Sequence, residues 1–483
     1  MNKTLFPIRI VTTFIALFLS IMFFPESSDA SYLTARGGML YNDNQEAVHL
    51  TGVNWFGFET TNMFPHGLWA RDYHGVLLQI RDMGFNCVRI PFCDEMLQSD
   101  AKPDKPNFYG EDPFYPRDKT EFNKELAGLS PIEMLDEIIR FAGVLGLTVI
   151  LDNHSREHDG YMNEKLWYTA KISEETWIND WVMLAARYRN NPTVIGFDLE
   201  NEPHGKTVDN GSTWAAGVAA TDWNEAAQKC GNAILAVNPD VLIIIEGVEQ
   251  YGETMYWWGG NLRGVKQHPI TLSKPEKLVY SPHEYGPEVF QQPWFFTDAF
   301  PSNMESIWDE AFGYIAKENI APLFIGEFGI SSMDGYEGRA GTWLTTFIAY
   351  MAKLGLSFTF WALNPNSGDT GGMLSNDWVS PVTWKLDQVK PLCAPLINEP
   401  MAVRQPQRRT DSRKISFLTG GNSIQAVDCP ATGLQIRLID LQGRTIRSSV
   451  QKTLSLSEVP RGMYMSVLYV NGRARLSEPV MVE

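Results

Sequence analysis

The stretch VIGFDLENEPHG, residues 194–205, opens with a short apolar run and then places Asp198, Glu200 and Glu202 at every second position. On an extended strand, this alternation sends all three carboxylates to one face. Like charges held close together in a dry place raise one another's pKa, which costs stability. Either the strand ends in solvent, where the charges are hydrated, or the rest of the chain builds a site around them.

Seven further stretches of the chain resemble this one. Each is a short apolar run without alternation that ends in polar or aromatic residues, and roughly 15 to 25 residues of mostly helical pattern follow it. Runs without alternation are typical of strands buried on both faces, as in parallel sheets. Eight such runs predict an α/β fold, a closed (β/α)8 barrel. In chain order they are VHLTGVNWFGFE from Val48, CVRIPF from Cys87, LTVILDNH from Leu147, VIGFDLENEP from Val194, VLIIIEGVE from Val241, LVYSPHEY from Leu278, PLFIGEFG from Pro322 and FTFWALNP from Phe358.

The helical stretches between the runs carry terminal signals of their own. In SPIEMLDEIIRFAGVLG, we expect Ser130 to cap the helix, Pro131 to occupy its first turn and Gly146 to lie near its end.

In a (β/α)8 barrel, the carboxyl ends of the strands and the loops after them surround the catalytic mouth. We therefore expect the polar ends of the eight runs to meet there, and the three alternating carboxylates to face this mouth instead of bulk solvent. The residues at these ends are Arg89, Asn153, His154, Asn201, Glu202, His283, Tyr285, Glu327 and Trp361.

The N-terminus has the pattern of a secretory signal peptide over residues 1–30. Lys3 and Arg9 supply positive charge, an apolar run follows from Ile10 to Phe24, and Ser28-Asp29-Ala30 fits a cleavage site. No second segment approaches the roughly 20 apolar residues that span a bilayer. The sequence therefore predicts an exported protein without a transmembrane segment.

The composition changes after residue 400. We expect a barrel domain over residues 31–400, a polar and basic linker over 401–414 (MAVRQPQRRTDSRK) and a small β-sandwich over 415–483, where short alternating runs are separated by glycine-containing turns. Residues 401–483 hold 12 Lys or Arg and 6 Asp or Glu, a net charge of +6, so the remainder of the −17 chain carries −23.

Composition also argues against several classes of function. A net charge of −17 disfavours nucleic-acid binding, which depends on neutralising phosphates. The 5 cysteines are odd in number and widely spread, so we expect mostly buried thiols. Neither a CxxC pair nor an HExxH motif occurs, and no metal or cofactor is predicted. The 15 tryptophans are ample for a large core, and some could bind the flat faces of sugar rings.

Glu202 and Glu327 are the natural pair for cleaving a glycosidic bond. That reaction uses one carboxyl group as an acid on the leaving oxygen and a second as a nucleophile or base. The two glutamates end the fourth and seventh runs, on opposite sides of the mouth. Arg89 and Tyr285 would keep Glu327 ionised, while a neighbouring carboxylate in a partly dry site would keep Glu202 protonated. Asp198 and Glu200 either contribute to that field or are hydrogen-bonded scaffold.

Other residues at the mouth suit substrate contacts. Asn201 is placed to bond a sugar 2-hydroxyl, and His154 and His283 to bind substrate or orient the glutamates. Trp361, which ends the eighth run, is the best candidate for the floor beneath the sugar. Trp55, Trp257 and Trp258 would extend this platform or belong to the core.

The ordered motifs VRIPF, DNH, NEP, PHEY, GEFG and FTFW resemble those of glycoside hydrolase family 5, over about residues 32–396. VNWFGFET, NPTVIGFDLENEP, YWWGGNL and LNPNSGDTGGML look like its bacterial endo-β-1,4-glucanase branch. The resemblance implies retaining hydrolysis of cellulose-type β-glucan, with Glu202 as acid/base and Glu327 as nucleophile. It also matches the remaining family positions, namely Arg89, His154, Asn201, His283, Tyr285 and Trp361. Glu200 departs from it, since that branch carries a histidine there, which leaves the pH optimum open.

Residues from about 415 to 483 more weakly resemble the C-terminal sorting domain of type IX secretion, through LIDLQGRTI and LSEVPRGMY. The competing interpretation is a carbohydrate-binding module, for which Tyr464 with Tyr469 would be the one aromatic cluster, because no tryptophan follows Trp384. The sequence as a whole predicts an endoglucanase that is secreted or held on the outer cell surface. The alternatives are the same barrel acting on mannan or xyloglucan, or a non-catalytic carbohydrate-binding or adhesion protein.

Overall fold

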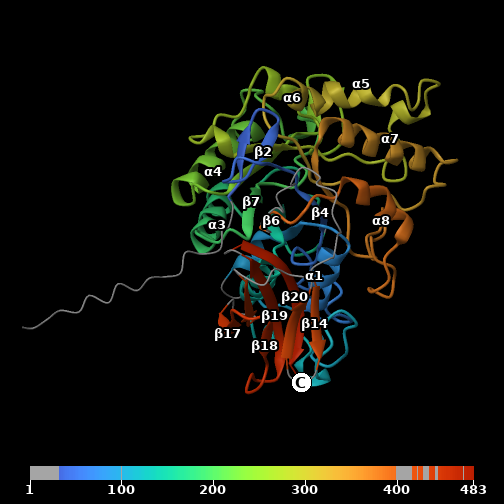
Figure 1. Ribbon diagram of the computed structural model, residues 1–483. Coiled ribbons are helices and arrows are strands. Elements are labelled where there is room, and N and C mark those ends of the chain that lie inside the picture. Colours follow the sequence, from blue (N-terminus) through green and yellow to red (C-terminus); the bar gives the residue numbers. More distant parts are fainter. Residues whose placement is uncertain are drawn as a thin grey trace, which may run out of the picture. The chain divides into compact units, whose positions relative to one another are not determined.

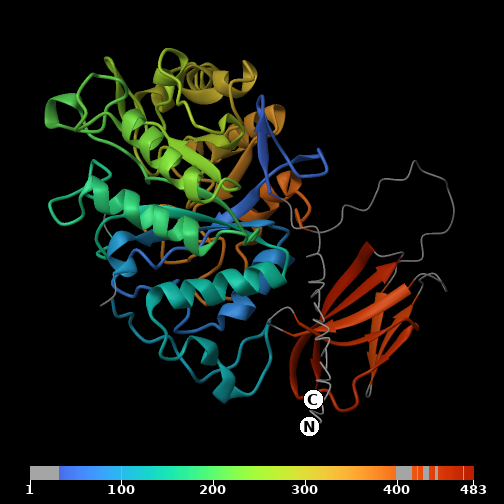
Figure 2. The ribbon, with the colours of Figure 1, turned by 90° about the vertical axis from the view of Figure 1, so that its left-hand side faces the viewer.

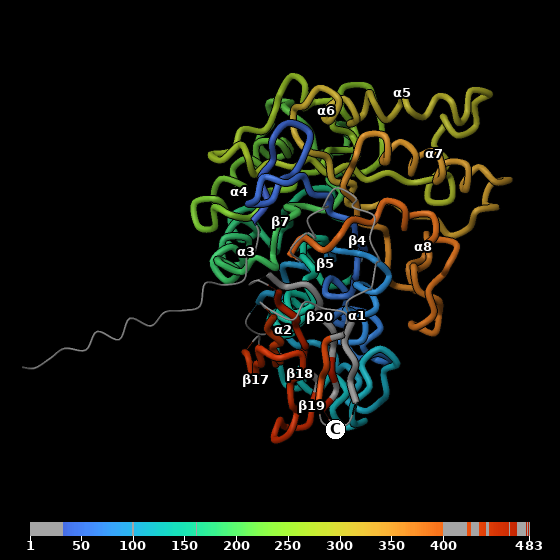
Figure 3. The backbone as a smooth tube through the Cα atoms, in the orientation of Figure 1, coloured from blue at the N-terminus to red at the C-terminus, as the bar shows by residue number. Residues whose placement is uncertain are grey.

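Eight parallel strands form a closed ring in the computed structural model, which confirms the predicted (β/α)8 barrel (Figures 1 and 3). Neighbours in the chain are neighbours in the ring, and the last strand pairs with the first. The bridges Tyr280 to Leu323 and His283 to Glu327 join the sixth strand to the seventh. The strands are β4 (Thr51–Asn54), β5 (Cys87–Cys93), β6 (Thr148–Ser155), β7 (Val194–Asp198), β8 (Leu242–Glu246), β11 (Leu278–Ser281), β12 (Phe324–Ile325) and β13 (Ser357–Phe360).

The structure describes residues 32–98, 101–160, 162–398, 416–420, 423–427, 434–440, 444–470 and 473–482. The predicted signal peptide (1–30) and linker (401–414) lie outside these residues.

Helices follow seven of the eight strands. They are α1 (Tyr73–Asp82), α2 (Pro131–Val144), α3 (Glu174–Arg187), α4 (Trp223–Val237), the pair α5 (Met304–Trp308) and α6 (Tyr314–Lys317), α7 (Arg339–Leu354) and α8 (Thr383–Val389). A single π-helical turn, Asp309–Gly313, joins α5 to α6. In α2, Ser130 and Glu133 form the reciprocal capping box, Pro131 opens the first turn, and Gly146 takes φ +78° just beyond the end. These findings confirm the predicted helix signals.

The expectation of a helix after every strand is wrong at β8. Residues 247–277, all within the described part of the chain, contain the hairpin β9 (Gln250–Tyr251) and β10 (Thr254–Met255) and short 3₁₀ turns, but no α-helix. This segment holds 5 glycines and 2 prolines, which disfavour a helix. The YWWGG sequence that follows the hairpin contributes Tyr256, Trp257 and Trp258 to one wall of the mouth.

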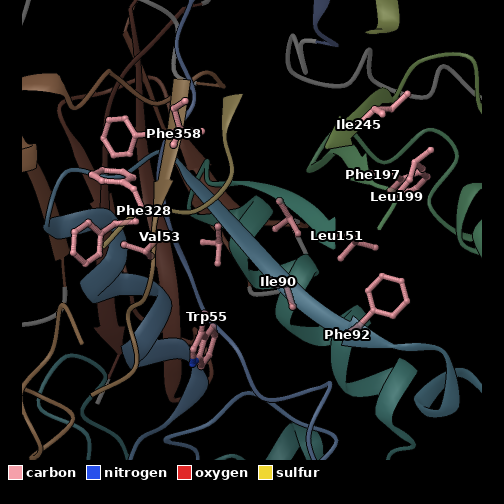
Figure 4. Close-up of a cluster of buried hydrophobic side chains, with 14 of the residues drawn as sticks. Val53, Trp55, Ile90, Phe92, Leu151, Phe197, Leu199, Ile245, Phe328 and Phe358 are labelled. Atoms are coloured by element: carbon pink, nitrogen blue, oxygen red, sulfur yellow. The ribbon is translucent and has the colours of Figure 1, made fainter. Parts of the chain in front are cut away.

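The barrel interior is filled by buried apolar side chains, as expected for strands buried on both faces. Its amino-terminal end is closed by a small sheet of β1 (Thr34–Arg36), β2 (Met39–Tyr41) and β3 (Ala47–Val48), whose Leu40 and Val48 join strand residues such as Ile150, Leu242 and Phe324 in one buried cluster. Between the strands and the helices lies a second and larger cluster, part of which Figure 4 shows around Val53, Ile90, Leu151, Phe197 and Phe328.

The C-terminal residues form two antiparallel sheets, drawn in orange to red in Figure 2. One contains β14 (Ser416–Gly420), β15 (Ser423–Val427) and β18 (Thr453–Ser455), and the other β16 (Leu434–Ile439), β17 (Thr445–Ser449), β19 (Gly462–Val470) and β20 (Arg473–Val482). Both sheets contribute to one core, with the alternating Leu434, Ile436 and Leu438 buried. The extra all-β unit predicted from the sequence is therefore present.

The four cysteines in the described part of the chain are free thiols, of which Cys87, Cys93 and Cys230 are buried and Cys393 is half-buried. Cys429 lies outside the described residues. Within the described ranges, no helix is both long and apolar enough to cross a membrane.

Candidate active site

Arg89, the third residue of β5, lies fully buried at the centre of the mouth. Its Nε donates to Asp198 (2.9 Å), its Nη1 to Glu327 (2.8 Å), and its Nη2 lies 3.3 Å from Glu246 and 3.1 Å from Asp152. Burial alone would lower the pKa of this guanidinium, but the surrounding carboxylates raise it well above its usual value. Arg89 is therefore a permanent cation that connects β5 to acids on or just beyond four other strands, β6, β7, β8 and β12.

Glu327 lies just beyond β12 and is nearly fully buried. One carboxylate oxygen accepts from Arg89 and the other from the Tyr285 hydroxyl at 2.6 Å. Both donors that the sequence suggested for this carboxylate thus contact it. A guanidinium and a hydroxyl on the two oxygens favour the ionised form and fix the orientation of the group.

Glu202 reaches the mouth by a route that the alternation does not describe. Strand β7 ends at Asp198, and Glu202 has a left-handed backbone with φ +51°. Its amide N–H donates to the Glu246 carboxylate at 2.8 Å, which holds this conformation, and its side chain accepts from His283 Nδ1 at 2.9 Å. The prediction that all three carboxylates share one strand face is therefore wrong, although Glu202 does enter the mouth.

The two glutamates meet over His283. Glu202, His283 and Glu327 each offer an atom within 4.8 Å of the other two. Burial, followed by the charges of Glu327 and Glu246, raises the pKa of Glu202 to about 7, although His283 opposes the shift. His283 also lies 3.1 Å from Glu246, and the carboxylates around it raise its pKa well above the usual value despite burial. The site thus combines a carboxylate held directly by a guanidinium and a hydroxyl with one whose pKa is raised.

Asp198 and Glu200 are each paired with a buried arginine that they share with other acids. Asp198 bonds Arg89, while Glu200 pairs with the buried Arg156, which also bonds Asp94 at 2.8 Å. These contacts favour the scaffold interpretation of the two acids. Burial raises the pKa of Glu200 well above its usual value, although Arg156 opposes the shift.

An aromatic and imidazole stack forms the floor of the site. The Trp361 ring lies against the His154 ring, with centroids 5.3 Å apart and planes within 1°, and against Phe56 at 5.4 Å. Asp152 accepts from His154 Nδ1 at 2.7 Å and, together with other acids, raises the His154 pKa to about 9 although burial opposes this. Trp361 remains half-buried, so part of its surface faces the cleft.

A cleft of about 440 Å³ lies above these residues. Glu202, Glu327, Tyr285 and Trp361 line it together with Trp257, Trp258 and Phe290 from the flanking loops. Trp258 is 39 % exposed, with one face stacked on His204 at 3.8 Å, whereas Trp257 is almost buried in the wall.

Trp55 is not part of this cleft, which corrects the expectation that it extends the platform. Its ring is completely buried and its Nε1 donates to the His66 carbonyl at 3.0 Å (Figure 4). A fully buried ring has no free face for a sugar, so Trp55 belongs to the core, the alternative that the sequence left open.

Two acidic residues of the site were missed by the sequence analysis. Glu246 accepts from the Glu202 amide and lies 3.1 Å from His283 Nε2, and Asp152 accepts from His154 Nδ1. Glu246 ends the fifth apolar run and was detectable, because polar residues at the carboxyl ends of barrel strands face the mouth. Nothing in the run VLIIIE itself identifies its partners.

Three groups of acids and histidines in the mouth are close enough to hold an ion, namely Asp152, His154 and Glu327; Asp198, Glu246 and His283; and Glu202, His283 and Glu327. In each group, a carboxylate already contacts Arg89 or His283. Donors occupied in this way suit an ion poorly, and the expectation of a metal-free reaction stays a prediction.

Comparison with known proteins agrees with this geometry. The family profile "Cellulase (glycosyl hydrolase family 5)" matches residues 42–367. An endoglucanase of Paenibacillus polymyxa is 42% identical over 408 residues, which cover 82% of this chain and 96% of the relative.

Solved structures of endocellulases are also similar. A glutamate-to-alanine variant of the Pyrococcus horikoshii enzyme, in complex with cellotetraose, is 39% identical with a TM-score of 0.69, over 76% of this chain and 99% of that one. The catalytic domain of the major endoglucanase of Xanthomonas campestris pv. campestris is 38% identical with a TM-score of 0.68, over 75% and 99%. The chain belongs to the cellulases of glycosyl hydrolase family 5, and its barrel is that of an endoglucanase.

Proposed function

We propose that this protein is a secreted endo-β-1,4-glucanase that cleaves internal bonds of cellulose-type glucans with retention of configuration. The observation that carries the mechanism is the approach of the Glu202 and Glu327 carboxylates to within 4.8 Å. Retaining enzymes hold their carboxyl groups about 5 to 5.5 Å apart, whereas inverting enzymes need roughly 6.5 to 9.5 Å to admit a water.

In the first step, Glu327 attacks the anomeric carbon while Glu202 gives its proton to the glycosidic oxygen, so that the leaving chain departs as an alcohol. Arg89 and Tyr285 keep Glu327 ionised and aimed, and the pKa of about 7 keeps Glu202 protonated in mildly acidic solution. In the second step, Glu202 takes a proton from water, which attacks the same carbon and releases Glu327.

Three further residues would position the sugar. Asn201 uses its oxygen to accept from Arg89 at 3.1 Å, while its amide nitrogen faces only the weakly accepting Met162 sulfur. That N–H is the natural donor to the sugar 2-hydroxyl. Asp152 engages His154 Nδ1, which leaves Nε2 for a second sugar hydroxyl, and Trp361 supplies the apolar floor.

The test uses the full chain on carboxymethyl-cellulose, mannan and xyloglucan, with E202Q and E327Q beside the parent. We expect viscosity to fall faster than reducing ends appear, on the cellulose derivative above all, and both variants to lose at least about 10³-fold in kcat. NMR of the first product should give the β-anomer. A better rate on mannan or xyloglucan would change the substrate, an α-anomer would overturn retention, and full activity of either variant would overturn the assignment of roles.

We also propose that residues 1–30 direct export, with 415–483 as a sorting domain of the type IX kind. A second interpretation, a carbohydrate-binding module, is disfavoured because Tyr464 is buried and donates to the Pro460 carbonyl, and the Arg437 guanidinium covers the Tyr469 ring at 4.6 Å. Removal of 415–483 should leave the enzyme inside cells of the source organism. If export persists while binding to insoluble cellulose is lost, the domain is a binding module instead.

A further inference from the structure

Met162 lines the cleft and has no part in the chemistry above. Its half-buried side chain borders the same space as Glu202, Glu327 and Trp361. The Met162 sulfur lies 2.7 Å from the Asn201 amide nitrogen, the group that we propose as the donor to the sugar 2-hydroxyl. A thioether therefore covers a substrate-binding donor in the free enzyme.

The segment that carries Met162 is tied to the loop that carries Asn201. The carbonyl of Lys165, shortly after Met162 in the chain, accepts from the amide of His204, shortly after Asn201, at 3.3 Å. The same carbonyl accepts from the Ser212 hydroxyl at 2.6 Å. Because these bonds join the two segments, the sulfur is held beside the Asn201 amide.

The oxidation state of this sulfur decides how strongly it competes with the sugar. A thioether is a weak hydrogen-bond acceptor, so a sugar hydroxyl displaces it from the Asn201 N–H at little cost. Oxidation to the sulfoxide makes the side chain polar and places an oxygen on the sulfur. That oxygen would accept from the same N–H, and the 2-hydroxyl of the substrate would then have to compete with it.

The cleft that admits the glucan also admits a dissolved oxidant to Met162. Oxidation of methionine requires access to the sulfur, and the other methionines in the described part of the chain either are buried or do not line the cleft. The buried ones are Met63, Met83, Met96, Met134, Met304, Met351, Met373 and Met465, and the half-buried ones are Met39, Met183, Met255 and Met333. Met162 therefore combines access for the oxidant with contact to the site.

We propose that Met162 is a site of reversible oxidation, at which a peroxide switches the enzyme off. The sulfur lone pair attacks one oxygen of hydrogen peroxide, an S–O bond forms, the O–O bond breaks, and the second oxygen leaves as water with both protons. Sulfur loses two electrons, which the peroxide gains, and the resulting sulfoxide occupies the Asn201 N–H. The inference rests on the proposed function, because it takes Asn201 as a donor to the bound glucan.

The test treats the full chain with dilute hydrogen peroxide and compares its activity on carboxymethyl-cellulose with that of the same protein before treatment. The parent should lose at least about 10-fold in kcat/KM, because the bond to the 2-hydroxyl strengthens in the transition state. Methionine sulfoxide reductases should restore the activity. M162L has no sulfur at this place and should keep at least about half of its own untreated activity. M39L is the matched control, since Met39 is a half-buried methionine of β2 at the other end of the barrel, and it should be inactivated like the parent.

Two further measurements do not depend on the loss of activity after treatment. M162Q places a carbonyl oxygen where the sulfoxide oxygen would lie, so without any peroxide it should be slower than M162L. Peptide mass spectrometry follows the uptake of oxygen at each methionine. Cellotetraose bound to E327Q should slow this uptake at Met162 and leave it unchanged at Met39.

The unfolding midpoint of each protein, before and after treatment, verifies that it stays folded. Inactivation of M162L as complete as that of the parent, or oxidation of Met162 without loss of activity, would overturn the proposal while leaving the endoglucanase assignment in place. A parent that cleaves no glucan before treatment would instead overturn the proposed function, on which this role of Met162 depends.

Discussion

Replacement of Glu246 by Gln tests how Glu202, the proposed catalytic acid, is kept protonated. Glu246 bonds the Glu202 amide and contacts both Arg89 and the far nitrogen of the His283 ring, so its charge lies on the opposite side of one imidazole from the Glu202 carboxylate. Gln keeps the shape and an oxygen acceptor but removes this charge. Because a nearby negative charge raises the pKa of Glu202, the variant should have a lower one.

The size of the effect follows from Coulomb's law. Two carboxylates on opposite nitrogens of an imidazole are roughly 7 Å apart, which gives about 2 kcal/mol at an effective dielectric constant near 20. Two effects reduce this value: the site relaxes, and His283 is less fully protonated once the Glu246 charge is gone. We therefore expect the Glu202 pKa to fall by about one unit. The catalytic acid must be protonated, and activity is lost as pH rises through its pKa. The alkaline limb of kcat/KM should therefore move to lower pH by about one unit.

The assay is the pH profile of kcat/KM on a chromogenic cello-oligosaccharide at fixed ionic strength. E288Q is the matched control, since Glu288 also accepts main-chain N–H groups but contacts none of the residues around Glu202 given above. Its alkaline limb should not move. A limb that stays fixed in E246Q, or moves to higher pH, would refute the argument that the Glu246 charge helps Glu202 keep its proton.

Three further changes separate catalysis from stability. R89K keeps the positive charge but loses the planar guanidinium that contacts several acids at once. We expect kcat to fall at least about 100-fold and the midpoint temperature of unfolding to fall. A kcat equal to that of the parent would contradict the central role of Arg89. W55A should lower the free energy of unfolding by about 3 to 5 kcal/mol, measured by chemical denaturation. W361A should lose activity but lower the free energy of unfolding by less than about 1.5 kcal/mol. A larger loss of stability in W361A than in W55A would contradict the place of Trp55 in the core. Glu284 is buried, and its carboxyl group accepts from the Tyr256 hydroxyl at 2.5 Å. Burial raises its pKa from the usual 4.5 to about 7. Because the folded protein holds this proton more tightly than the unfolded chain, the parent should lose stability as pH rises from about 4.5 to 7. E284Q should flatten that dependence, as measured by unfolding midpoints at pH 5 and 8, and an unchanged slope would exclude Glu284 as its source.

The strands and most helices of the barrel could be predicted because their signals are local. A non-alternating run such as VLIIIE indicates a two-sided burial whatever its neighbours are, and the Ser130 capping box lies within four residues of sequence. The position of the mouth then followed, because in any (β/α)8 barrel the carboxyl ends of the strands surround it. Nothing local indicated that residues 247–277 form a hairpin and turns, apart from their glycines and prolines.

The contacts inside the mouth could not be predicted in the same way. Glu202 lies four residues beyond the end of its strand, and its backbone conformation depends on Glu246, 44 residues away in the chain. Whether a tryptophan in NWFGFE or in YWWGG faces the cleft depends on side-chain packing across loops, so Trp55 and Trp258 were indistinguishable from the sequence. Periodicity describes a residue's neighbours on one element, whereas these residues are placed by other elements.

The proposed division of roles between Glu202 and Glu327 is supported by their unequal surroundings. Carboxyl groups with oxygens within 4.8 Å do not readily ionise together in a buried site, so one of them holds a proton. Glu327 has a guanidinium on one oxygen and a hydroxyl on the other, both of which favour the anion. The His283 ring that donates to Glu202 also lies close to Glu246 and Glu327. Glu327 has the Arg89 guanidinium and the Tyr285 hydroxyl directly on its two oxygens, whereas the Glu202 side chain accepts from His283. We therefore propose that the proton rests on Glu202, which is the asymmetry that an acid and a nucleophile require.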